Sequence, residues 1–244
     1  MSETRIYLDT SLYPDSVLNL PTDAARHVTR VLRLRAGTPL VLFNGEGGEL
    51  DAEIIEVRGQ AVAVRTEQHR DVDREPPLTL SLVQGISRSE RMDWVIQKAV
   101  ELGVSRIEPV FTARSVVRLN IERTARRLQH WRGIAVSACE QCGRNRIPEI
   151  MNPLHMDEWA LNRRAGSGNA LLLQPGAEKK LTDIEYAGGQ VTLLIGPEGG
   201  LTQAEAERAK AIGFVPVSLG PRTLRTETAA IASLAVIQHH WGDF

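Results

Sequence analysis

Apolar and polar positions along the chain change pattern near residue 70. Before it, closely spaced apolar stretches are separated by short turns that contain glycine, which is typical of a small β-barrel or meander. One segment, 21–34, instead has helical spacing, and Thr22 or Asp23 is its candidate N-cap. The predicted strands of this region are 5–9, 38–44, 49–57 and 60–67.

From residue 78 onward, apolar strands alternate with helical patterns. Continuous apolar strands separated by helices predict a mostly parallel sheet that is covered on both faces. Two capping boxes, Ser87 with Glu90 and Thr202 with Glu205, mark helix starts. The predicted strands are 78–86, 106–111, 170–175, 191–197 and 214–221. The predicted helices are 87–103, 121–142, one that begins at Thr202 and stops at Gly213, and 226–241.

The charged stretch 69–77 ends in two prolines and separates the two patterns, so it predicts a linker. We expect a small β domain over 1–70, a linker over 71–77 and an α/β domain over 78–244. A chain of 244 residues is long enough for two modest domains of this kind.

Composition adds two constraints. The net charge is −1, which excludes a globally basic nucleic-acid-binding protein, so any RNA contact must come from local patches. The basic residues are 25 Arg and 4 Lys. The planar guanidinium fork suits phosphate and stacks on bases, although a GC-rich codon usage explains the same bias.

Cellular location follows from what the sequence lacks. Two cysteines in a chain of this size indicate a reducing compartment. Residues 1–16 contain no apolar core of signal-peptide length, and no stretch approaches the ~18 apolar residues of a membrane span. We expect a cytoplasmic, soluble protein with no membrane partner.

Three predicted strands end in segments rich in glycine and proline: 174–176, 196–200 and 219–227. Ligands of open α/β sheets bind at the carboxyl ends of strands, and glycine lets the backbone approach a ligand. The P-loop pattern is absent because Leu201 and Thr202 follow the last glycine, and the Rossmann glycine spacing is absent too. The three segments therefore predict backbone groups that hydrogen-bond an uncharged base or ribose, in preference to a phosphate-binding loop. The alternative is that they are tight turns with no ligand.

At these residues the chain resembles a known family. "LLIGPEGGLTQAE" (193–205) and "LGPRTLRTETAAIASLAVIQ" (219–238) are similar to the two C-terminal motifs of the SPOUT superfamily, and most of all to its RsmE family of 16S ribosomal RNA uridine-N3 methyltransferases. The resemblance runs from about residue 5 to the end. Four further segments agree with it: "HVTRVLRLRAG" (27–37), "GEGGELDAEI" (45–54), "RMDWVIQKAVELGV" (91–104) and "ACEQCGRNRIPEI" (138–150).

The resemblance implies a fold and a cofactor. The fold would be a small N-terminal PUA-like β-barrel that binds RNA, followed by a SPOUT α/β domain with a mostly parallel sheet and a deep trefoil knot. S-adenosyl-L-methionine would sit in the knot between the three strand-end loops. Its predicted contacts are Leu173, Gln174, Gly196, Pro197, Glu198, Gly199, Gly200, Leu219, Gly220, Leu224, Arg225 and Thr226.

The resemblance also implies partners and a product. The chain would act as a homodimer with the final helix near the interface. Its substrate would be 16S ribosomal RNA within the small ribosomal subunit, and its product 3-methyluridine in the decoding region. An RNA-binding protein of the same fold without catalysis, and a methyltransferase with another RNA target, are the competing hypotheses.

Uridine N3 carries a proton that must leave before or during methylation. The site therefore needs a base, or a positive group that stabilises the uridine anion. We predict that Arg225 stabilises this anion, with Glu227 or Glu198 as candidate bases. Glu227 could equally offset a helix dipole, and Glu198 could be a turn residue that faces water.

Local arginine clusters are the candidate RNA contacts. Arg26, Arg30 and Arg33 have the spacing of one helix face. Arg123, Arg126, Arg127 and His130 form a similar face on 121–142, and such faces are often merely solvated. The predicted RNA-binding residues are Arg26, Arg30, Arg33, Arg144, Arg146 and Arg222.

Cys139 and Cys142 form a C-x-x-C pair, but a zinc site needs about two more ligands, and no second pair exists. Packing is the preferred interpretation for the pair. His239 and His240 at a helix C-terminus are favourable without a metal. We expect no metal site, and we expect Lys98 and Glu101 to serve helix packing and charge pairing.

Overall fold

A computed structural model describes residues 3–115, 121–163 and 168–244 of the chain. It divides into two compact units: an N-terminal unit, Met1–Glu75 with Cys139–Ile147, and a C-terminal unit, Pro76–Ala138 with Pro148–Phe244. The division differs from the predicted one because the short segment Cys139–Ile147 belongs to the N-terminal unit. The hydrophobic pattern of the sequence does not indicate that this segment belongs to the N-terminal unit.

The N-terminal unit is built on a five-stranded sheet with the order β1-β3-β4-β5-β2. β1 is parallel to β3, and the other neighbouring strands are antiparallel. Apolar side chains of the strands and of the short helix form one core, as their alternation along β4 and β5 requires. The elements are β1 (Arg5–Tyr7), β2 (Val17–Asn19), α1 (Thr22–Arg26), η1 (His27–Val31), β3 (Pro39–Phe43), β4 (Glu49–Arg58) and β5 (Ala61–Arg70).

The helix predicted over 21–34 is shorter and of mixed type. Pro21 is its N-cap and no side chain caps it, so the predicted Thr22 or Asp23 cap is wrong. The Oγ1 of Thr29 donates to the carbonyl oxygen of Ala25 at 2.8 Å, and residues 27–31 form a π-helical turn. Arg33 lies beyond the turn with φ 55°, so the predicted single helical face of three arginines does not form.

A buried charge cluster anchors Cys139–Ile147 within the N-terminal unit. The carboxylate of Glu49 is fully buried and pairs with the guanidinium groups of Arg5, Arg70 and Arg74. Asn145 donates to the same carboxylate at 3.2 Å and to the carbonyl oxygen of Val72 at 2.9 Å. A buried carboxylate is retained at low cost only when it is paired and hydrogen-bonded, which this arrangement provides.

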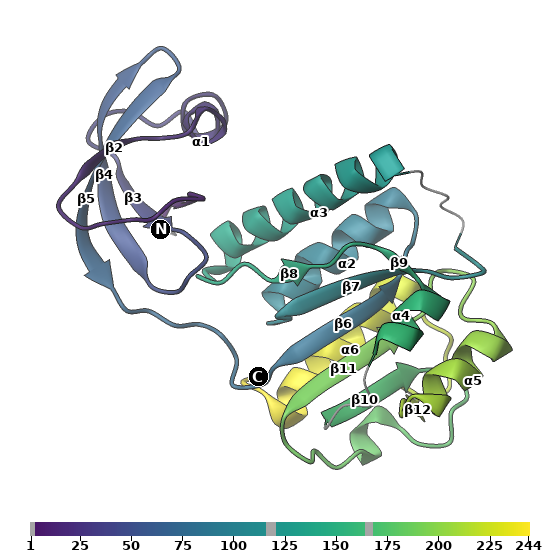
Figure 1. Cartoon of the computed structure of the whole chain (residues 1–244). Coiled ribbons are helices and arrows are strands. Elements are labelled where there is room, and N and C mark those ends of the chain that lie inside the picture. The colour runs from purple at the N-terminus through teal and green to yellow at the C-terminus, as the bar shows by residue number, and fades with distance from the viewer. Residues whose placement is uncertain (1–2, 116–120, 164–167) are drawn as a thin grey trace. The chain divides into compact units, whose positions relative to one another are not determined.

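The C-terminal unit contains a parallel sheet with the order β12-β10-β11-β6-β7-β8, and β9 also pairs with β7. Figure 1 shows α4 and α5 on one face of this sheet and α2 and α6 on the other. The strands are β6 (Leu80–Gly85), β7 (Arg106–Phe111), β8 (Glu149–Ile150), β9 (Leu154–His155), β10 (Gly168–Leu173), β11 (Gln190–Ile195) and β12 (Val215–Val217). The helices are α2 (Ser89–Glu101), α3 (Ile121–Cys142), α4 (Met156–Asn162), η2 (Leu181–Asp183), α5 (Gln203–Ala211) and α6 (Thr226–Trp241).

The predicted fold class is confirmed in its small N-terminal domain and its parallel C-terminal sheet. Every residue of β6 is buried, as expected for a central strand that is covered on both faces. Val83, Leu172 and Leu194 pack with Trp159 of α4 and Phe214 on one face. The threading of the chain through a knot stays a prediction.

The two capping boxes have different outcomes. Thr202 and Glu205 form the predicted box at the start of α5. Ser87 does not cap α2, because its hydroxyl donates to the carbonyl oxygen of Gly85 at 3.3 Å and Arg88 occupies the N-cap. Among the described helices, none is long and apolar enough to span a membrane.

Candidate functional site

The three predicted strand-end loops meet around one cavity of about 870 Å³ in the C-terminal unit. The first loop follows β10, the second follows β11, and the third runs from the end of β12 to the start of α6. Parallel strands place their carboxyl ends at one edge of the sheet, which is why loops far apart in sequence converge there. All twelve residues predicted to bind the cofactor line this cavity.

The loop 196–200 is fixed to its neighbours by hydrogen bonds at its first residue. Thr226 Oγ1 donates to the carbonyl oxygen of Gly196 at 2.7 Å. The fully buried Gln84 donates through Nε2 to Thr226 Oγ1 at 3.1 Å. These bonds join the second and third loops to the end of β6, so the cavity wall is preorganised.

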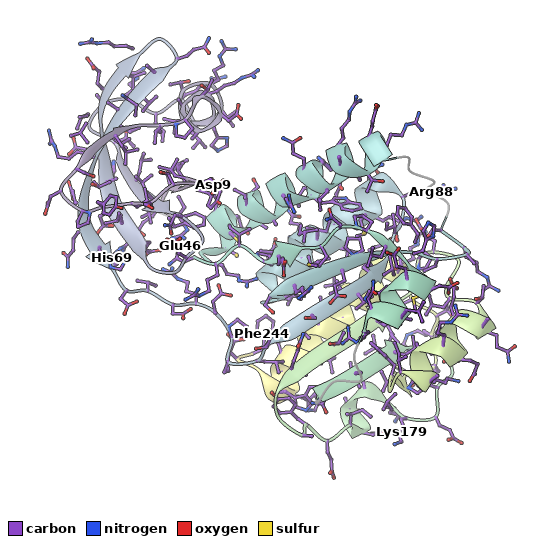
Figure 2. All side chains as sticks on the ribbon, viewed as in Figure 1. Asp9, Glu46, His69, Arg88, Lys179 and Phe244 are labelled. Carbon is purple, nitrogen blue, oxygen red and sulfur yellow. The ribbon has the colours of Figure 1, made fainter. Side chains whose placement is uncertain are left out.

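Glu198 in the same loop binds the start of α2. Its Oε1 accepts the backbone N–H of Arg88 at 3.0 Å and lies 3.4 Å from Nη1 of Arg91. Figure 2 labels Arg88 at this end of α2. The alternative that Glu198 is a turn residue facing water is wrong, because its side chain is only 17% exposed.

Arg114 holds the other end of the loop. Its Nη1 donates to the carbonyl oxygens of Gly199 at 3.0 Å and Leu201 at 3.4 Å. A Cβ on Gly199 would lie 2.9 Å from the Cβ of Arg114, so this approach requires glycine. Arg91 and Arg114 line the cavity but were missed by sequence reasoning, because their partners lie about a hundred residues away in the chain.

Two of the three candidate catalytic residues line the cavity. Arg225 is the N-cap of α6, is exposed and lines the cavity. Glu198 lines the cavity as well, whereas Glu227 is not part of its described lining. Glu227 Oε1 lies 3.9 Å from Nε of Arg91. One guanidinium, that of Arg91, therefore neutralises both carboxylates.

Several features of the wall are suited to a polar ligand. Gln174 lines the cavity, and its Oε1 is buried with no hydrogen-bond partner among the described residues. Gly200 and Gly220 have φ values of 68° and 121°, and a Cβ on either would meet no atom within 4 Å. The wall thus offers open backbone and an unsatisfied amide oxygen to a bound molecule.

The candidate RNA contacts are distributed over both units. Arg26, Arg30, Arg33 and Arg146 are exposed in the N-terminal unit, and Arg222 is exposed at the cavity. Arg144 is buried, and it donates to both carboxylate oxygens of Glu75. Its guanidinium is thus used inside the unit, so its predicted availability to RNA is not supported by its position.

The remaining candidate residues have local explanations. Cys139 is buried and free, and burial raises the pKa of its thiol to about 12. Cys142 is also free. Lys98 and Glu101 form the predicted ion pair at 2.7 Å. Within the described parts of the chain, no three His, Cys, Asp or Glu side chains are placed to hold a metal ion.

Comparisons with known proteins agree with this geometry. The RNA methyltransferase domain model matches residues 74–238, and the RNA methyltransferase PUA domain model matches residues 20–67. A ribosomal RNA small subunit methyltransferase E of Buchnera aphidicola is 35% identical over 98% of this chain and 97% of its own length. The chain belongs to this methyltransferase family.

Solved structures support the same assignment. A ribosomal RNA small subunit methyltransferase E from Neisseria gonorrhoeae, bound to S-adenosyl methionine, is similar with a TM-score of 0.92, 37% identity and full coverage of both chains. A Legionella pneumophila protein with bound S-adenosyl methionine gives a TM-score of 0.95 at 41% identity, again over both full chains. The family resemblance predicted from the motifs is confirmed.

Proposed function

We propose that the protein transfers a methyl group from S-adenosyl-L-methionine to N3 of one uridine in the decoding region of 16S ribosomal RNA. One observation supports the proposal above others: the three loops that carry the family motifs converge on a single cavity whose walls are fixed by hydrogen bonds. Family membership supports the reaction class. The uridine N3 position follows from the motif resemblance alone.

The cavity fits S-adenosyl-L-methionine. Its orphaned Gln174 oxygen and the open backbone at Gly200 and Gly220 can meet the polar edges of the adenosine. When bound, the cofactor supplies an activated methyl group, so the protein's work is alignment of the uridine and stabilisation of charge.

We expect exposed arginines of both units to contact the RNA. Arg222 lies in the cavity wall, where a guanidinium can contact a phosphate next to the target uridine. Arg26, Arg30, Arg33 and Arg146 would contact phosphates from the N-terminal unit. We expect these contacts to be electrostatic, so RNA affinity should fall as salt concentration rises.

Homodimerisation is also proposed, on the motif resemblance. α6 is apolar around most of its circumference, which is typical of a helix that is covered on several sides. Light scattering of the purified protein measures the mass directly. A mass of one chain at micromolar concentration would contradict the dimer.

Gly85 provides a test of the cofactor loop. A Cβ on Gly85 would lie 2.5 Å from the backbone nitrogen of Pro197, a contact that real structures do not allow. We expect Gly85→Ala to displace the loop and weaken S-adenosyl-L-methionine binding by at least about tenfold, measured by calorimetry. Gly133→Ala is the matched control, because a Cβ there meets no atom within 4 Å in α3. Equal affinity of the Gly85→Ala variant and wild type would contradict the proposed cavity wall.

The substrate particle is tested by label transfer. Methyl-labelled S-adenosyl-L-methionine is incubated with the protein and with intact small subunits, naked 16S RNA or large subunits that lack the modification. The proposal predicts label in 16S RNA, highest from small subunits. Label in large-subunit RNA alone, or in none of the three, would contradict it.

A further inference from the structure

The cavity offers few groups that could accept a proton. Among the residues that the structure describes around it, the ionisable side chains are two carboxylates and four guanidinium groups. The carboxylates are Glu198 and Glu207, and the guanidinium groups are those of Arg91, Arg114, Arg222 and Arg225. A general base must come within about 2.6–3.2 Å of the proton that it removes.

Glu198 lies in the cavity wall, but its carboxylate already binds the start of α2. Oε1 accepts the N–H of Arg88 and faces Arg91, while Oε2 is buried from solvent and has no partner among the described residues. The carboxylate thus lies on the N-terminus of α2, a helix of 13 residues whose dipole favours an anion there. Glu198 therefore connects the loop 196–200 to the N-terminus of α2 and fixes the position of the loop.

The other carboxylates are no better placed. Glu227 is absent from the described lining, and its Oε2 is buried as well. Glu207 lies on α5, where its Oε1 binds Nζ of Lys210 at 2.9 Å and its side chain is 59% exposed to water. Arg225 contrasts with all three: it lines the cavity, it is exposed, and its side chain has no hydrogen bond or ion pair with any residue in the described ranges.

We infer that the site activates uridine by stabilising its N3 anion with Arg225, without a carboxylate base; this rests on the proposed function. The N3 proton leaves to water, and its electron pair stays on the uridine with charge shared by O2 and O4. N3 then forms the new bond to the methyl carbon. The methyl–sulfur bond breaks with its electrons remaining on sulfur, which becomes a neutral thioether. Arg225 is a catalytic residue in this account, and Glu198 is a positioning residue.

The pH dependence of the methyl-transfer step separates the two mechanisms. A carboxylate base is fully ionised by about pH 6, so the rate would be constant above that pH. If the uridine anion is the reacting species, the rate rises about tenfold per pH unit from about pH 6 until the bound uridine is ionised. A more acidic 5-fluorouridine at the same position should move the whole profile to lower pH.

The experiment measures single-turnover methylation of small subunits that contain uridine or 5-fluorouridine, from about pH 5.5 to 9. We expect a rising profile, a shift to lower pH with 5-fluorouridine, and a loss within about tenfold for Glu198→Gln, because the amide oxygen still accepts the N–H of Arg88. Glu198→Ala should chiefly weaken cofactor binding.

Two results would overturn the inference while leaving the proposed function intact. One is a rate that is flat above about pH 6 and unchanged by 5-fluorouridine. The other is a loss of about a thousandfold or more in Glu198→Gln or Glu207→Gln with unchanged cofactor affinity. Absence of 3-methyluridine from the wild-type reactions would instead reject the proposed function, and the inference with it.

Discussion

Arg225→Ala should lower the methyl-transfer rate constant by about a hundred- to a thousandfold, the range measured when one preorganised donor to a developing anion is removed. The side chain is exposed in the cavity and makes no hydrogen bond or ion pair within the described ranges, so the change should leave the fold intact. Affinity for S-adenosyl-L-methionine should change less than about threefold. Single-turnover rates and calorimetry give the two quantities separately.

Arg222→Ala is the matched control, since Arg222 lines the same cavity and is also exposed. A phosphate contact should raise KM for the RNA and leave the rate constant at saturation within about tenfold of wild type. Arg225→Lys keeps the charge but loses the planar fork, and should recover part of the rate. If Arg225→Ala weakens cofactor binding as much as it slows transfer, Arg225 is a cofactor contact and its catalytic role is wrong.

Glu49→Ala should destabilise the N-terminal unit by about 3–5 kcal/mol, because it leaves the buried Arg5 and its neighbours without their shared carboxylate. Hydrogen exchange of peptides from β3 and β4 measures the change locally. Glu56→Ala on the same strand is the control. Its ion pair with Arg58 is exposed, so the loss should be below about 0.5 kcal/mol.

The same carboxylate predicts a pH dependence. Burial raises the pKa of Glu49, but hydrogen bonds from Arg5, Arg74 and Asn145 outweigh it and hold the pKa below its ordinary value. Its stabilising effect is therefore complete above the pKa of an unfolded glutamate and is lost as pH falls through the lowered pKa. Protection of β4 in Glu49→Ala should lose this acid dependence. An unchanged acid dependence would assign it to other groups.

The cavity could be predicted from the sequence because each of its walls is marked by residues that are adjacent in sequence. Each wall is a glycine- and proline-rich segment directly after an apolar strand, and the parallel topology brings such segments to one edge. The resemblance to the family motifs predicts the same cavity-lining residues as cofactor contacts. Thr202 and Glu205 were predictable for the same reason, since a capping box spans only four residues.

The features that sequence reasoning missed depend on distant partners or on local competition. Arg91 gains its role from Glu198 and Glu227, more than a hundred residues away. Ser87 lost its predicted cap to the competing carbonyl of Gly85. The π-helical turn at His27–Val31 leaves no clear mark in the hydrophobic pattern.

The segment Cys139–Ile147 is a further case of this kind. The sequence predicts Arg144 and Arg146 of this segment as RNA contacts, and the segment's motif resembles a family signature. Asn145 instead donates to Glu49, which is 96 residues away in sequence, and Arg144 binds Glu75. Long-range charge pairing of this kind cannot be predicted from spacing, because the same arginine pattern also suits a solvated RNA-binding surface.

The most direct test of the account is the identity of the nucleoside that receives the methyl group. Small subunits that lack the modification are incubated with the protein and labelled S-adenosyl-L-methionine, and the 16S RNA is digested to nucleosides for mass spectrometry. We expect labelled 3-methyluridine from wild type and a strong loss of it in Arg225→Ala. Label on another nucleoside, or on the ribose, would contradict the proposed uridine N3 reaction even if the cofactor binds.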